Sequence, residues 1–130
     1  MSHLIWAPEI HRVFNQWVVY FAAANDAAID QKSMTFKHRI YALICQEDDP
    51  LTGEWIEAGQ VDTGLDSFCL DATSFVVDQQ QYLIWAQKSD DIAGNSNLYI
   101  AAMRDPRTLG LPSYDDQSSG VWMGASQIRR

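Results

Sequence analysis

The stretch WAPEIHRVFNQWVVYFAAA, residues 6–24, contains two runs of aromatic and β-branched residues joined by a short polar segment. Such runs, bounded by Asn, Asp, Gly or Pro, are typical of strands, and helical periodicity is poor along the whole chain. The arrangement returns at residues 70–88, which read LDATSFVVDQQQYLIWAQK. A shift of 64 residues superposes the two stretches, aligning Ala7 with Asp71, Val13 with Val77, and Phe21 with Trp85. The chain therefore contains one strand–turn–strand unit twice.

Further runs of the same kind predict an all-β protein. Strands are expected at residues 6–14, 16–24, 38–46, 54–61, 69–77, 81–88 and 97–104. Tight hairpin turns are expected at Asn15-Gln16 and at Asp78-Gln79-Gln80. The polar stretches 25–37 and 89–96 are interpreted as exposed loops.

The repeat continues into the third strand of each unit. Ile40-Tyr41-Ala42 matches Leu98-Tyr99-Ile100, and an Asp-Pro pair follows in both copies, at residues 49–50 and 105–106. Proline cannot donate a hydrogen bond to a β-ladder, so the pair marks the end of a strand. Repeated units of four short antiparallel strands predict β-propeller blades. We expect one partial propeller domain over residues 1–130, with blade one at about 5–62 and blade two at about 68–128. The last strand of blade two is expected within residues 121–128.

Composition excludes several classes of partner. Of the 130 residues, 9 are Lys or Arg and 17 are Asp or Glu, and the net charge of −8 disfavours binding to nucleic acid or anionic membranes. The longest apolar run, residues 17–24, is shorter than the roughly 20 residues of a membrane-spanning helix. No basic-then-apolar leader opens the chain, so the sequence as it stands predicts a cytoplasmic protein and leaves secretion of a longer parent protein open. Cys45 and Cys69 are expected to be buried free thiols.

Two blades leave apolar faces that a closed ring would cover. Val18, Tyr20, Leu83 and Trp85 lie on expected strands, and burying each side chain fully is worth about 1.5–3 kcal/mol. The sequence therefore predicts a homo-oligomer, with a dimer favoured because closed symmetry leaves no face unpaired. Two copies would supply four blades.

The motif Ile5-Trp6-Ala7-Pro8-Glu9-Ile10-His11, followed by Trp17-Val18-Val19-Tyr20-Phe21-Ala22-Ala23, resembles glycoside hydrolase family 43. The resemblance is to its exo-acting α-L-arabinofuranosidase branch. Further segments follow in that branch's order, namely His38-Arg39-Ile40-Tyr41, Gly53-Glu54-Trp55 and Leu70-Asp71-Ala72-Thr73-Ser74-Phe75. The resemblance covers the chain to about Leu111, and residues 112–130 match no segment. It implies a five-bladed propeller with a glycosidase site in its channel, of which this chain resembles the central blades, the second and third.

The resemblance implies three carboxylates: a general-base Asp on the first blade, a general-acid Glu in a Glu-Gly-Pro motif, and an Asp that tunes the acid's pKa. Only the third has a matching position here, Asp71. No Glu is followed by Gly-Pro, and none of the five residues before Trp6 is Asp. Inverting hydrolysis needs both an acid and a base. The lone chain is therefore expected to be an inactive fragment or degenerate homologue.

Three residues are site candidates. Asp71 is assigned to the family's pKa-modulator position and to sugar binding, with turn capping as the alternative. Trp6 belongs to a Trp-Ala-Pro motif, and the resemblance implies that the Trp of this motif lines the sugar site. Packing in the core is the alternative role for Trp6. Glu9 is a speculative substitute acid, and a structural hydrogen bond is its alternative.

The remaining polar residues point to no metal and no cofactor. His11 and His38 lack metal-ligand spacing, so they are interpreted as structural histidines. The acidic runs at residues 47–49 and 90–91 are interpreted as solvated loop charge. Three functions stay open: the inactive family-43 fragment or homologue, an oligomer that rebuilds a channel and binds or cleaves arabinose- or xylose-type sugars, and a non-catalytic interaction scaffold.

Overall fold

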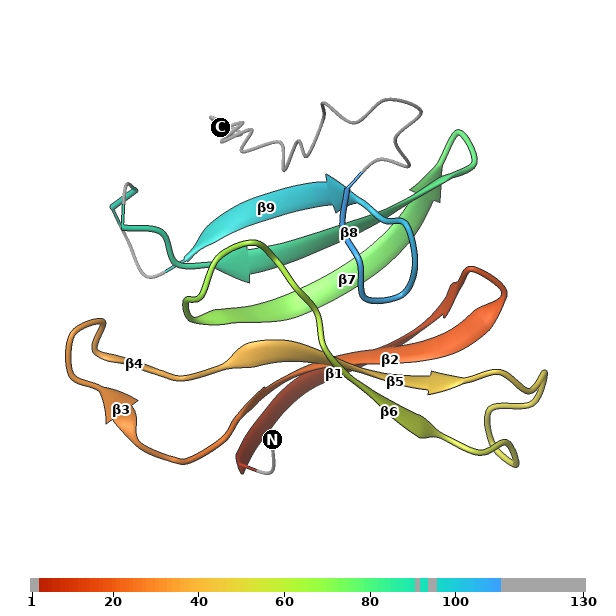
Figure 1. Ribbon diagram of the computed structural model, residues 1–130, viewed down its shortest axis with the longest axis horizontal. Helices are drawn as coiled ribbons and strands as arrows, with labels where there is room; N and C mark the ends of the chain where they lie inside the picture. The colour runs from red at the N-terminus through yellow and green to blue at the C-terminus, as the bar shows by residue number, and fades with distance from the viewer. Residues whose placement is uncertain (1–2, 91, 94–95, 111–130) are drawn as a thin grey trace.

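The computed structural model describes residues 3–90, 92–93 and 96–110, and two antiparallel sheets dominate it (Figure 1). The first sheet has the order β1-β2-β5-β6. Its strands are β1 (His3–Val13), β2 (Gln16–Ala24), β5 (Arg39–Cys45) and β6 (Ile56–Gln60). The second sheet has the order β7-β8-β9, with strands β7 (Cys69–Val77), β8 (Gln80–Gln87) and β9 (Asn97–Ala102). The described residues form no helix, so the all-β prediction is confirmed.

The four-stranded first blade forms as expected, whereas blade two has three strands within the described residues. Its expected fourth strand, at residues 121–128, lies outside the described ranges. The stretch 25–37 is not only loop, because β3 (Ile29–Asp30) and β4 (Thr35–Phe36) pair there as a small hairpin. The first tight turn lies one residue earlier than expected, at Phe14 and Asn15, whose φ angles are 47° and 60°.

Strand β1 contains a bulge near its start. Trp6 pairs with Ala22 of β2 and Glu9 pairs with Tyr20, so three steps along β1 oppose two steps along β2. Within this segment Ala7 has a φ of 46°, in the left-handed region. A bulge of this kind bends the strand and changes the direction of its side chains.

Strand β7 repeats this bulge at the equivalent place. Leu70 pairs with Ala86 of β8, Thr73 pairs with Ile84, and Asp71 between them has a φ of 54°. The shift of 64 residues read from the sequence therefore aligns the irregular parts of the two blades as well as the regular parts.

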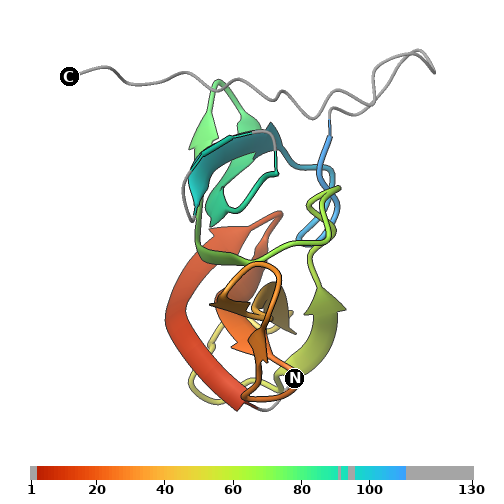
Figure 2. The same ribbon diagram turned by 90° about the vertical axis from the view of Figure 1, so that its left-hand side faces the viewer.

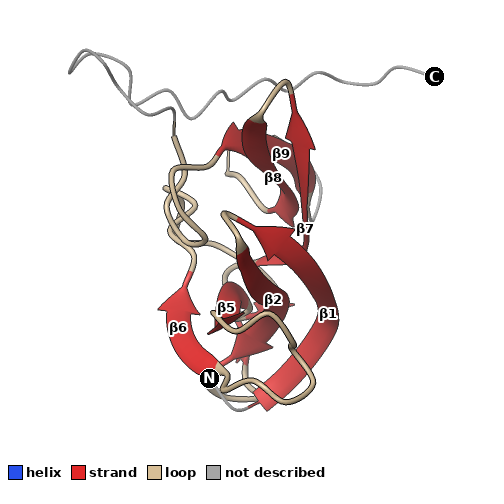
Figure 3. Cartoon of the chain, turned by 90° about the vertical axis from the view of Figure 1, so that its right-hand side faces the viewer, coloured by secondary structure: helices blue, strands red, loops and turns tan. Residues whose placement is uncertain are grey.

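The two sheets pack face to face, with β7 against β1, β2 and β5 (Figures 2 and 3). The largest fully buried side chains of this core include Trp85, Tyr20, Ile40, Leu83 and Met103. The buried Tyr20 hydroxyl donates a hydrogen bond of 2.7 Å to the Pro106 carbonyl, 86 residues later in the chain. Cys45 and Cys69 are both buried and free, as the sequence predicts.

The Asp-Pro pair forms the same turn after the third main strand of each blade. Asp49 Oδ1 accepts a hydrogen bond of 2.9 Å from the Leu51 amide, and Asp105 Oδ1 accepts one of 2.8 Å from the Arg107 amide. In both turns the carboxylate thus accepts a hydrogen bond from the amide of the residue that follows the proline, as in an Asx turn.

A buried glutamine ties the linker between the blades to blade two. Gln87 Oε1 accepts a hydrogen bond of 2.7 Å from Trp85 Nε1, and Gln87 Nε2 donates to the Leu65 carbonyl at 2.9 Å and to Ser67 Oγ at 3.1 Å. Gln87 is fully buried, so these bonds satisfy polar atoms that water does not reach.

Candidate functional site

The three candidate residues lie on β1 and β7, which are the first strands of the two sheets and which pack against each other. In a propeller the first strand of each blade borders the central channel. Trp6 and Glu9 flank the bulge of β1, and Asp71 lies within the bulge of β7. The candidates thus share one edge of the molecule.

Asp71 is exposed, and within the described residues its carboxylate makes no hydrogen bond and no ion pair. The loop aspartates differ in this respect. Asp26 accepts the Ala28 amide at 2.9 Å, and Asp30 accepts the Lys32 amide at 2.8 Å. These backbone hydrogen bonds hold the pKa of both loop carboxyls below its ordinary value. Asp71 therefore does not cap a turn in the way that those aspartates do.

Trp6 is 37% exposed and packs on His38. The two ring centroids are 3.9 Å apart at an interplanar angle of 29°, and the Phe36 ring meets Trp6 edge-on at 5.7 Å. His38 is fully buried, and its Nε2 donates a hydrogen bond of 2.8 Å to the Leu4 carbonyl. The His38 carbonyl accepts the Cys69 amide at 3.2 Å, which connects this stack to the start of β7.

Glu9 belongs to a polar contact that crosses from blade one to blade two. His11 Nε2 lies 3.0 Å from Glu9 Oε2 and 3.5 Å from Thr73 Oγ1 of β7. Thr73 is also the residue that the repeat aligns with Glu9. The imidazole therefore engages the carboxylate that was the candidate for a substitute acid.

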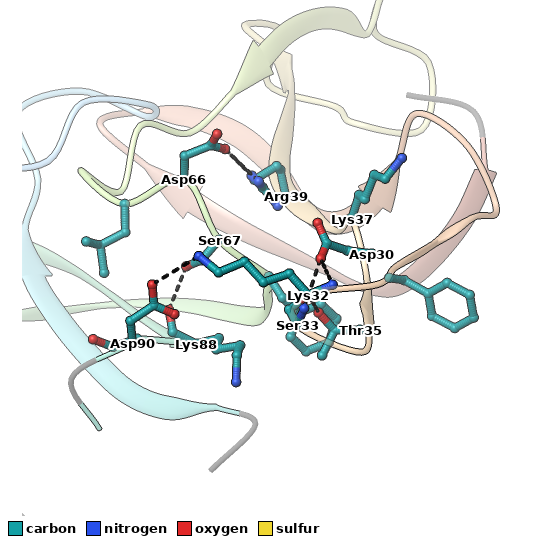
Figure 4. Close-up of a pocket in the computed structure, with 14 residues that line it drawn as sticks. Asp30, Lys32, Ser33, Thr35, Lys37, Arg39, Asp66, Ser67, Lys88 and Asp90 are labelled. Carbon is teal, nitrogen blue, oxygen red and sulfur yellow. Dashed lines mark hydrogen bonds and ion pairs between the residues drawn. The ribbon is translucent and has the colours of Figure 1, made fainter. Parts of the chain in front are cut away.

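A pocket of about 520 Å³ lies between the β3–β4 hairpin, the linker between the blades and the segment that follows β8 (Figure 4). Its walls come from residues 30–39, 65–68 and 88–90. Phe36 and Phe68 supply aromatic surface, and serine and threonine hydroxyls with charged side chains supply the polar surface. Aromatic faces beside hydroxyl, carboxylate and guanidinium groups suit a ligand that is rich in hydroxyls.

Ion pairs on the surface line the walls of this pocket (Figure 4). Arg39 Nε donates to Asp66 Oδ1 at 3.0 Å, and its Nη1 donates to the His38 carbonyl at 2.8 Å. Lys32 of blade one lies 3.9 Å from Asp90 of blade two. The pocket thus has structural links across the two blades.

The sequence alone did not indicate this pocket, because most of its residues come from stretches interpreted as exposed loops and from the linker. Trp6, Glu9 and Asp71 do not line it. Trp6 touches it through Phe36, which is both its ring partner and part of the wall. The pocket and the bulge edge are therefore neighbouring but separate features.

In the described ranges, no three His, Cys, Asp or Glu side chains are grouped as metal ligands. The same ranges contain no helix of the length and apolar character that a membrane span requires.

The family model described as glycosyl hydrolases family 43 matches residues 1–125. The expectation that residues 112–130 match no family segment is therefore wrong for residues 112–125. The extracellular exo-α-(1→5)-L-arabinofuranosidase of Streptomyces avermitilis is 41% identical over 123 residues, which are 94% of this chain and 24% of that protein. The enzyme of the same name from Streptomyces chartreusis is 38% identical over 127 residues, covering 92% of this chain and 37% of that protein.

The crystal structure of α-L-arabinofuranosidase from Lactobacillus brevis has the same fold, with a TM-score of 0.80 and 47% identity. The match covers 85% of this chain and 34% of that one, so the chain spans about a quarter to a third of these relatives. The two sheets are thus two blades of a five-bladed propeller type. The resemblance read from the sequence is confirmed: the chain belongs to glycosyl hydrolase family 43, in its exo-acting arabinofuranosidase branch.

Proposed function

We propose that these two blades form part of the sugar site of a family-43 arabinofuranosidase, and that the lone chain binds arabinofuranosyl groups without hydrolysing them. The observation that carries the proposal is the Asp71 carboxylate. It is exposed at the channel-side bulge and has no partner within the described residues, so it is available to a sugar hydroxyl. Trp6, with about a third of its surface exposed, offers an aromatic face on the same edge.

The blade pattern does not require a carboxylate at this place, which supports a role in the site. The equivalent residue of blade one is Ala7, in the same left-handed backbone conformation. A carboxylate present in one blade and absent from the other serves something other than the shared fold.

Hydrolysis with inversion needs a carboxylic acid at the departing oxygen and a carboxylate that activates water, roughly 6.5–9.5 Å apart. Asp71 is one carboxylate at the modulator position of the family pattern. Glu9 lies two residues after Ala7, which is the blade-one equivalent of Asp71. Glu9 Oε2 already lies 3.0 Å from His11 Nε2. General acid–base catalysis is worth about 10²–10⁴-fold, and no position of the sequence matches the family's acid or base motif that would supply it.

The activity test uses the purified chain and an aryl α-L-arabinofuranoside. We expect no release of the aryl group above background. Turnover that disappears in both Asp71→Asn and Glu9→Gln would show that new residues have taken the acid and base roles, and would overturn the proposed inactivity.

The binding test is a calorimetric titration with an arabino-oligosaccharide, with a xylo-oligosaccharide as competitor. Losing a charge-assisted hydrogen bond costs about 1.5–3 kcal/mol, so Asp71→Asn should weaken binding by about 10- to 100-fold. Asp78→Asn is the matched control, because Asp78 is also exposed and has a φ of 48°. Equal affinities for the two variants would remove Asp71 from the site.

A second candidate is an assembly of copies that rebuilds a channel and cleaves such sugars, favoured by the apolar sheet face described below. In the activity test it would give turnover that rises with protein concentration faster than linearly. The names of the two Streptomyces relatives place those enzymes outside the cell, which supports secretion of the protein that carries these blades.

A further inference from the structure

Positions that the repeat makes equivalent differ sharply in exposure. Ile40 and Ala42 of β5 are fully buried. Their equivalents on β9, Leu98 and Ile100, are 68% and 36% exposed. The side chains are apolar in both blades, so the difference measures what a neighbouring sheet covers in one blade and leaves open in the other.

One sheet face, which we call the open face, carries the exposed Leu98 and Ile100 together with the half-buried Tyr82 and Ile84. Ile84 pairs directly with Ile100, and residues paired in this way point to the same side of a sheet. The repeat aligns Tyr82 and Ile84 with Val18 and Tyr20 of blade one, which are fully buried. Each member of the open face thus has a buried apolar counterpart.

Within this chain, the buried residues of blade one that correspond to the open face are covered by blade two, through the side of its sheet opposite the open face. Its members Leu83, Trp85 and Tyr99 are buried in the core that the two sheets share. A surface like that of Leu83, Trp85 and Tyr99 therefore fits a sheet face equivalent to the open face.

Blade one carries a related surface on its far side, although Phe21 and Tyr41 of that side are only 6% and 8% exposed in the single chain. The repeat aligns Leu83, Trp85 and Tyr99 with residues of the far face, which we define as Ile10, Val19, Phe21, Tyr41 and Leu43. Phe21 and Tyr41 stack with ring centroids 5.9 Å apart, as Trp85 and Tyr99 do at 5.7 Å. Ile10, paired with Val19, is 51% exposed, whereas its equivalent Ser74 is buried between the blades.

We propose that a second copy of the chain docks head to tail, with its far face on the open face of the first copy. The contact would reproduce the interface that joins the two blades within one chain. The open face is equivalent to the blade-one side of that interface, and the far face is equivalent to its blade-two side. A contact between two open faces would instead place equivalent surfaces on each other, a pairing that the described part of the chain does not use. The proposal does not depend on sugar binding.

A head-to-tail contact leaves one open face and one far face at the ends of the assembly, so it extends until a ring closes. Two copies supply four of the five blades of the family ring. The mass of the wild-type assembly should therefore rise with concentration from 14.7 kDa through twice that value.

The test uses one charged substitution on each face, at side chains that are already exposed in the single chain. Leu98→Lys blocks the open face and Ile10→Lys blocks the far face. Leu51→Lys is the charge-matched control, because Leu51 is 92% exposed in a loop outside both faces. Light scattering coupled to size exclusion gives the masses, and circular dichroism checks that every variant keeps its β spectrum. If Leu98→Lys fails to fold, Ile100→Lys replaces it, and Leu43→Lys likewise replaces Ile10→Lys.

Each face variant alone should lose association and elute at 14.7 kDa, whereas Leu51→Lys should associate like the wild type. The decisive sample is an equal mixture of Leu98→Lys and Ile10→Lys. Each variant keeps the face that the other lacks, so the mixture should form a one-to-one dimer of twice the chain mass. A monomeric wild type would overturn the proposal. A mixture that stays monomeric would also overturn it, since the intact far face of one variant would then not bind the intact open face of the other. An Ile10→Lys variant that associates by itself would overturn it as well, since this indicates contact between two open faces.

Discussion

Ala7 and Asp71 occupy the same place in successive blades, each within a one-residue bulge of its first strand and with φ angles of 46° and 54°. The backbone conformation is therefore a property of the blade, and the carboxylate is an addition to it. Stability and ligand binding at this position can be separated by substitution.

Asp71→Gly should leave the protein at least as stable as the wild type and raise the free energy of unfolding by up to about 1 kcal/mol. Glycine adopts positive φ without a steric cost, which outweighs its larger entropy in the unfolded chain. Urea unfolding provides the measurement, with Asp71→Ala expected to fold because alanine already occupies position 7. A loss of stability larger than 1–2 kcal/mol in Asp71→Ala would assign the carboxylate a structural role.

Trp6→Ala should lower the free energy of unfolding by about 2 kcal/mol. The substitution removes the stack on His38 and the edge contact with Phe36, and aromatic pairs contribute about 0.5–1.5 kcal/mol each beyond the area they bury. Urea unfolding followed by tryptophan fluorescence measures the change. Trp6→Phe should recover part of the loss. If Trp6→Ala were as stable as the wild type, the ring contacts would contribute nothing to stability, and the whole indole would be available to a sugar.

Gln87→Met should destabilise the protein by about 1–3 kcal/mol, because it leaves the buried Trp85 Nε1 without its acceptor and removes the shorter of the two hydrogen bonds to the Leu65 carbonyl, which keeps only the Thr63 hydroxyl at 3.2 Å. Thermal unfolding checks the size of the effect. Gln60→Met, at an exposed position on β6, is the matched control and should change stability by less than about 0.5 kcal/mol. Equal effects of the two substitutions would mean that the Gln87 network contributes nothing.

The stability of the protein should fall in alkaline solution partly because of Cys69. Burial raises the pKa of this thiol to about 11. Above the ordinary thiol pKa of about 8.5, the unfolded chain ionises while the folded chain holds its proton, so the free energy of unfolding falls as pH rises. The contribution is fully present below that value and is lost by about pH 11.

Urea unfolding of the wild type and Cys69→Ala at several pH values isolates this contribution. Burial also raises the pKa of Tyr20, which titrates in both proteins and cancels in the comparison. The gap between the two stability curves should narrow between about pH 8.5 and pH 11, by at most about 1.4 kcal/mol for each pH unit. Curves that stay parallel would contradict the raised pKa.

The sequence predicts β2 and β7 to the residue because turn-forming residues end each run abruptly. It places the start of β1 three residues late, since the pairing of His3 with Ala24 depends on a partner strand rather than on the local pattern. The strands β3 and β4 have two residues each, which is too short for any periodicity to appear. Long elements follow from local composition, whereas short pairings follow from tertiary contacts.

The site was less accessible to sequence reasoning. The repeat singles out Asp71 because its counterpart is Ala7, but no local pattern shows that His11 meets Thr73, 62 residues away. The interpretation of His11 as a structural histidine did not extend to a link between the blades. The pocket needs the hairpin, the linker and the end of β8 to fold against one another, so its lining emerges only in three dimensions.

The hydrogen bond from Tyr20 to Pro106 has a consequence for synthesis on the ribosome. The acceptor is made 86 residues after the donor, and at about 5–20 residues per second this corresponds to about 4–17 s. The rest of blade one is translated in that interval, but the face that holds the tyrosine has no cover until blade two emerges. The nascent chain therefore passes through a period of seconds in which an apolar sheet with an unsatisfied hydroxyl is exposed to the cell, and chaperones that shield such surfaces have that period in which to act.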